Sequence, residues 1–143
     1  MTELPPLIRD QRRIDADHLR LLRIFHFIAA GMAVLGLLFL FAHFAMFRAF
    51  MDDPRIWAGK NQQPPPAEFF AMFKWFYVVF GLWFLVSGIV NVASGIFIGQ
   101  RKHRTFSFVV AAIDCLHMPF GTILGVFTIT VLMRDSVREL YEN

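Results

Sequence analysis

Three long apolar stretches constrain this chain more than any other feature of its sequence. They run from Leu21 to Phe47, from Phe69 to Ile98 and from Thr105 to Met133. A helix that crosses a bilayer needs about 20 apolar residues, and each stretch is longer than that. The first two are almost uninterrupted, whereas the third contains Asp114 and His117. We therefore predict an all-α integral membrane helical bundle.

Composition supports this class of protein. Hydrophobic residues make up 57% of the 143 residues and include 18 phenylalanines, and the charged residues gather outside the apolar stretches. A soluble domain is closer to half apolar and a quarter charged. The chain leaves almost no room for a separate soluble catalytic unit. Because Lys and Arg collect in the cytoplasmic flanks of membrane helices, we interpret the net charge of +3 as membrane topology and expect no nucleic-acid partner.

The apolar stretches divide the chain into a short arm and one transmembrane helical domain. Residues 1–20 form a polar cytoplasmic N-terminal arm, and residues 21–143 form the domain, with an extracytoplasmic loop at 48–68. In the arm, Asp15 or Asp17 is a candidate N-cap for a helix that enters the membrane. The remainder of the arm either rests on the headgroups or is a frayed tail.

Small residues follow a regular spacing in the second apolar stretch. Glycines recur every seven residues, which is about two turns of helix, so they lie on one face together with two serines. Small residues let membrane helices approach closely. We predict a helix-packing seam made of Gly81, Ser87, Gly88, Ser94 and Gly95. Gly121 and Gly125, four apart in the third stretch, form a second packing motif, which serves contacts within the chain or between copies.

The third stretch is either one helix kinked at Pro119 or a hairpin of two shorter helices. With four crossings the cytoplasmic side holds ten of the 14 Lys and Arg residues, whereas with three crossings it holds eight. Pro119 and Gly121 also occupy the second and fourth positions of a turn, and Thr122 can cap the helix that follows. We favour four transmembrane helices, with three as the alternative.

Polar residues inside apolar stretches are the candidates for function. Asn91 lies near the middle of the second stretch, and Asp114 and His117 lie three residues apart on one helical face. An ionisable group at the bilayer centre costs about 2.5–3.5 kcal/mol, so it is retained for a reason. Three readings remain open: Asp114 caps a turn or bonds His117, the pair contacts a partner subunit, or it handles protons or ions.

The sequence indicates no cofactor or metal site and no catalytic residues. His26 and His43 lie at opposite ends of the first helix, about 25 Å apart, so they cannot share a metal within one chain. Cys115 is expected to be a small core residue. We find no phosphate-binding loop, zinc-ligand cluster or hydrolase constellation in the sequence.

Three segments resemble an uncharacterised family of small bacterial four-helix membrane proteins, a domain of unknown function. They are the opening segment His18–His26, the exit of the second helix into a basic turn at Ser94–Arg104, and the Pro-Phe-Gly-Thr-x-x-Gly stretch Pro119–Gly125. The resemblance implies a four-helix topology in the bacterial cytoplasmic (inner) membrane and brings no activity, substrate or cofactor with it. Asp114 and His117 depart from it, since apolar or amide residues are expected at these positions.

From these patterns we expect a non-enzymatic accessory or scaffolding subunit with a cytoplasmic N-terminus. It would pack in the lipid bilayer against other membrane proteins or copies of itself. The alternative is a small oligomeric channel or transporter in which Asn91, Asp114 and His117 line a polar path.

Overall fold

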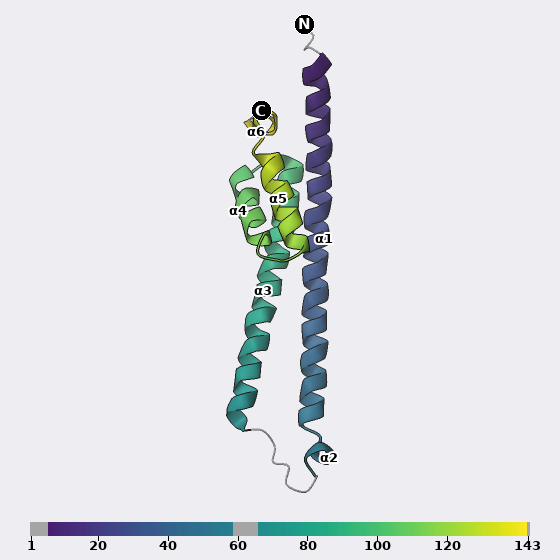
Figure 1. Ribbon diagram of the computed structural model, residues 1–143, viewed down its shortest axis with the longest axis vertical. Coiled ribbons are helices and arrows are strands. Elements are labelled where there is room, and N and C mark those ends of the chain that lie inside the picture. The colour runs from purple at the N-terminus through teal and green to yellow at the C-terminus, as the bar shows by residue number, and fades with distance from the viewer. Residues whose placement is uncertain (1–5, 59–65, 143) are drawn as a thin grey trace. The chain divides into compact units, whose positions relative to one another are not determined.

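The computed structural model describes residues 6–58 and 66–142, and all regular secondary structure in them is helical. The all-α class predicted from the sequence is therefore confirmed. The elements are α1 (Pro6–Met51), α2 (Pro54–Trp57), α3 (Ala67–Gln100), α4 (Arg104–Asp114), α5 (Phe120–Leu132) and α6 (Asp135–Glu142) (Figure 1).

Helix α1 is 46 residues long and begins at Pro6. Proline suits the first helical position because its missing N–H would have no partner there. The prediction that Asp15 or Asp17 caps a helix was wrong, because both residues lie inside α1. Asp15 is fully buried. It therefore serves tertiary packing rather than helix initiation.

Among the described residues, two helices are long and apolar enough to cross a membrane, or three if α5 and α6 are counted as one bent span. The qualifying segments are Asp10–Met51, with 42 residues, and Glu68–Gln100, with 33 residues. Helix α3 begins directly after Pro66, while Pro64 and Pro65 lie outside the described residues. These two helices contain the first and second apolar stretches of the sequence.

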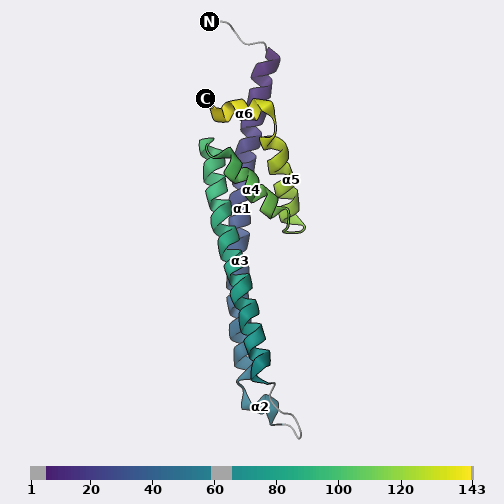
Figure 2. The same cartoon turned by 90° about the vertical axis from the view of Figure 1, so that its left-hand side faces the viewer.

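The third apolar stretch forms two helices. Helix α4 has 11 residues and α5 has 13, which correspond to about 16 Å and 20 Å of helix. Each is shorter than a bilayer hydrocarbon core of about 30 Å. Residues 115–119 connect them and include a cis peptide bond between Met118 and Pro119. Helix α6 then bends away from α5 by 74° (Figure 2).

The chain divides into two compact units. The hairpin unit comprises Met1–Gly31 and Ile89–Asn143, and the aromatic unit comprises Met32–Gly88. The hairpin unit thus contains the first part of α1, the last part of α3 and the short helices α4 to α6 (Figure 1). Its apolar core consists of Leu19, Leu22, Ile98, Leu124, Val131, Leu132 and Val137.

The aromatic unit is held together by ring contacts between α1 and α3. Phe47 stacks on Phe73 with their ring centroids 5.1 Å apart, and Phe44 meets Tyr77 edge-on at 5.0 Å. His43 Nδ1 lies 2.7 Å from the Tyr77 hydroxyl. Most other large apolar side chains of this unit are exposed.

Candidate functional site

Five polar side chains meet inside the hairpin unit, and they come from four helices. His26 belongs to α1, Asn91 and Ser94 to α3, Asp114 to α4 and Thr128 to α5. None of the five residues is more than 3% exposed. We call this group the buried polar cluster.

The hydrogen bonds of the cluster form a chain in which each group donates to the next one, and the chain ends at Asp114. Asn91 Nδ2 donates to Asp114 Oδ1 over 2.9 Å, which leaves the amide oxygen of Asn91 facing His26. Because that oxygen can only accept, His26 Nδ1 carries the proton of their 2.7 Å bond. With the proton on Nδ1, Nε2 can accept, and the hydroxyls of Ser94 and Thr128 lie 3.5 Å and 3.4 Å from it.

The second carboxylate oxygen of Asp114 is less well satisfied. Oδ2 is buried, and no hydrogen-bond partner for it is present among the described residues. It lies 3.8 Å from His26 Nδ1, whose proton already goes to Asn91. One acceptor of the cluster is therefore left without a hydrogen bond from the described residues.

Helical spacing explains how the chain assembles the cluster. Asn91 and Ser94 are three residues apart, so both lie on the face of α3 turned towards His26. Asp114 ends α4 and Thr128 lies in the middle of α5. A polar group buried without a partner costs free energy, so each of these side chains favours the arrangement in which all four helices meet.

The structure brings two of the three predicted polar candidates, Asn91 and Asp114, into direct contact. His117 lies in the connection between α4 and α5, and its backbone N–H donates to the Asp114 carbonyl over 2.8 Å. Sequence reasoning missed His26 and Thr128 as members of the site and assigned Ser94 to the packing seam alone. The available signal was a polar residue within an apolar helix, which does not reveal its partner.

Two of the three glycines of the predicted seam, Gly81 and Gly95, lie at contacts within the two units. In the hairpin unit, a Cβ at Gly95 would lie 3.3 Å from the Phe27 ring. In the aromatic unit, a Cβ at Gly81 would lie 3.6 Å from Leu40, and Gly36 is also close to a ring, that of Phe84. Ser87 and Gly88 are half-buried on the same helix.

Gly121 and Gly125 face α4. A Cβ at Gly125 would collide with the Ala111 carbonyl oxygen, and one at Gly121 would collide with the Asp114 carbonyl oxygen. This contact lies within one chain. The prediction that Gly121 completes a turn and Thr122 caps the next helix was wrong, because α5 already begins at Phe120 and Pro119 occupies its N-cap. The Thr122 hydroxyl instead donates to the Cys115 carbonyl over 2.9 Å.

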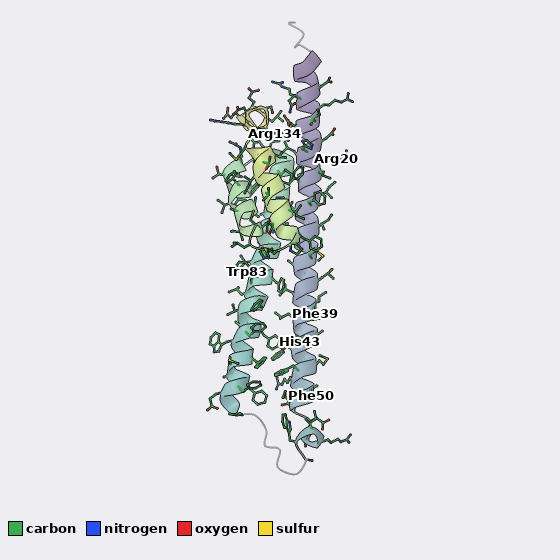
Figure 3. The ribbon with its side chains drawn as sticks, in the orientation of Figure 1. Arg20, Phe39, His43, Phe50, Trp83 and Arg134 are labelled. Carbon is green, nitrogen blue, oxygen red and sulfur yellow. The ribbon has the colours of Figure 1, made fainter. Side chains whose placement is uncertain are left out.

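A second polar contact ties the start of α1 to the junction of α5 and α6. Arg134 Nη1 donates to Asp15 Oδ1 over 3.1 Å and to His18 Nδ1 over 3.0 Å. Gln11 also donates to Asp15. Figure 3 shows Arg134 at this junction beside α1, whereas Arg20 points to the other side of the helix.

The turn between α3 and α4 forms an open depression of about 480 Å³ with α6. Residues 101–105 line one side, and Arg138, Tyr141 and Glu142 line the other. Arg101 and His103 adopt positive φ angles of 54° and 49°, which turn the chain sharply here. We call this depression the basic pocket.

Within the part of the chain that the structure describes, no group of three or more His, Cys, Asp or Glu side chains is arranged to hold a metal ion. Comparisons of the chain with protein-family models, curated proteins and solved structures found no match. What the protein does must therefore be argued from its own geometry.

Proposed function

We propose that this chain is a non-enzymatic membrane protein that acts as an accessory or scaffolding subunit. The observation that supports the proposal best is the closed state of the buried polar cluster. His26, Asn91 and Asp114 bond one another within a single chain and are almost completely shielded from solvent. Polar groups used in this way specify a packing arrangement rather than line a path.

In this proposal α1 and α3 cross the bilayer, and the α4–α5 hairpin enters from the cytoplasmic side and returns to it. The support is length and charge. Both short helices fall below the thickness of the hydrocarbon core, and basic residues stand where the hairpin begins, at Arg104, and where it ends, at Arg134. Buried backbone other than helix is tolerated at membrane depth where protein covers it. Both termini then lie in the cytoplasm.

Membrane insertion and topology have their own test. Extraction of membranes at alkaline pH should leave the chain in the pellet. A reporter fused after Asn143 should show that the C-terminus lies in the cytoplasm. Release into the supernatant would refute insertion. A reporter found outside the cytoplasm would refute the hairpin topology and would leave the proposal of membrane insertion unchanged.

The accessory role is tested by purification in mild detergent, with particle mass and co-purifying proteins read together. We expect a membrane protein partner in fixed ratio to this chain. A particle whose mass equals one chain plus detergent, with nothing bound, would contradict the proposal.

The second candidate is a small oligomeric channel or transporter, and the unsatisfied Asp114 Oδ2 is the observation that favours it. It requires a particle made of several copies and ion flux in liposomes. Because Asp114→Asn keeps the shape of the side chain and removes its charge, flux carried through the cluster should collapse in this variant. Flux that survives it would exclude the polar path through Asn91, Asp114 and His117.

A further inference from the structure

The basic pocket is not used by the proposed function, and its charge is unbalanced. Arg101, Lys102, Arg104 and Arg138 contribute four positive charges, and Glu142 contributes the one carboxylate among the lining residues. The surplus of three positive charges stands in an open depression, where counter-ions have access. Such a site favours an anionic ligand.

The cations of the pocket are not equivalent. Arg104 donates through Nε to the Leu132 carbonyl over 2.8 Å, and its Nη2 reaches the same oxygen. Arg138 pairs with Glu142 over 3.0 Å. These contacts hold two guanidinium groups in place at the wall. Arg101 and Lys102 are exposed, and they supply the charge that a ligand would meet first.

A hydrogen-bond donor lies in the same wall. The Tyr141 hydroxyl is buried and has no hydrogen-bond partner among the described residues. Burial raises the pKa of Tyr141 to about 12, against the opposing effect of Arg104 and Arg101, so the hydroxyl keeps its proton at neutral pH. A phosphate oxygen is the kind of acceptor that arginine and a phenolic donor recognise together, and the buried hydroxyl has to be uncovered as the ligand enters.

An apolar track leaves the pocket along α4. Thr105 lines the pocket, and Val109 and Ala112 follow it at helical spacing on α4, with Leu116 just beyond the end of the helix; all four residues are exposed. Val109 is 53% exposed and Leu116 is 74% exposed. An apolar track that begins at a basic pocket matches a molecule with an anionic head and a hydrocarbon tail, and a free phosphate would make no use of it.

We propose that the basic pocket binds the phosphate headgroup of an anionic phospholipid, whose acyl chain lies along the outer face of α4. The cytoplasmic leaflet supplies this ligand in the proposed topology, so the inference rests on the membrane insertion proposed above. Each Lys or Arg near an anionic membrane surface adds to the attraction, which makes the two exposed cations the main determinants of affinity.

The test is lipid retention by the full-length chain, measured by native mass spectrometry in a neutral detergent with equal amounts of phosphatidylglycerol and phosphatidylcholine. The wild-type chain should retain phosphatidylglycerol selectively. The double variant Arg101→Gln/Lys102→Gln should lower that retention by about tenfold or more. Tyr141→Phe should lower it by a smaller factor, because it removes one hydrogen bond.

The matched control is Arg13→Gln/Arg20→Gln, which removes two exposed charges from α1 outside the pocket and should change retention less than twofold. An equal loss in the control would overturn the site in favour of diffuse attraction. Equal retention of both lipids would overturn charge recognition. Displacement by millimolar inorganic phosphate would identify the ligand as free phosphate instead of lipid. Because alkaline extraction tests insertion separately, failure of the pocket and failure of the proposed function remain distinguishable.

Discussion

The hairpin unit and the aromatic unit are built on the same two long helices, and different chemistry holds each of them together. In the hairpin unit, α4 and α5 join α1 and α3, and hydrogen-bonded polar side chains are buried where these helices meet. In the aromatic unit the contacts between α1 and α3 are made by rings, and the polar pair His43–Tyr77 remains exposed.

The difference shows how the number of helices decides what a polar residue can do. Four surrounding helices can shield a histidine and a carboxylate and offer each a partner. Two helices leave their outer faces open, so most large apolar side chains there are exposed. A hydrogen bond should therefore contribute more to stability in the hairpin unit than in the aromatic unit.

The largest effect is expected from Asn91→Leu. This change leaves both the His26 Nδ1–H and the Asp114 Oδ1 without their common partner, and we expect it to lower the free energy of unfolding by about 3 kcal/mol. The measurement is denaturant unfolding in micelles followed by circular dichroism. Tyr77→Phe removes the exposed hydrogen bond of the aromatic unit and should cost about 0.5 kcal/mol. Similar losses in both variants would abolish the distinction between the units.

The next effect concerns two glycines that differ in their surroundings. Gly125→Ala places a methyl group against the Ala111 carbonyl and should cost about 2 kcal/mol through overpacking. Gly31→Ala meets nothing within 4 Å and should stabilise α1 by up to about 1 kcal/mol, because alanine favours helix over glycine. The same unfolding assay compares them. A neutral Gly125→Ala variant would refute the close contact between α4 and α5.

The smallest effect separates a partly buried ion pair from an exposed one. Arg134→Gln removes the charge beside the fully buried Asp15 and should cost about 1.5 kcal/mol. Arg48→Gln breaks a pair whose side chains are both 71% exposed and should cost about 0.3 kcal/mol. Limited proteolysis near the C-terminus should also accelerate in the first variant. Unchanged proteolysis would show that Arg134 does not hold α1 against the α5–α6 junction.

Sequence reasoning succeeded where a single helix carries the information. The extent of the apolar stretches predicted the long apolar parts of α1 and α3, because length and hydropathy are properties of one segment. It did not predict that α1 begins at Pro6, within the segment expected to be a polar arm. It failed at Asp15, where an acidic residue early in a helix resembles an N-cap and is in fact the buried partner of Arg134. Nothing local distinguishes these two uses of a carboxylate.

The pairing of Asn91 with Asp114 shows the same limit. Both residues are polar groups in apolar stretches, but helical spacing indicates only a pairing of Asp114 with His117, three residues further along the chain. The structure gives the Asp114 side chain a partner 23 positions away and connects both to His26, 65 positions before Asn91.

The sequence by itself determined that this chain is helical and that its first two apolar stretches are long enough to cross a bilayer. These properties follow from composition within one segment. Only the tertiary structure decided that residues 104–132 form two short helices, and that His26, Asn91, Asp114 and Thr128 share one buried cluster. The physical reason is that a buried polar group is stabilised by partners from other helices, and no periodicity within its own helix specifies which ones.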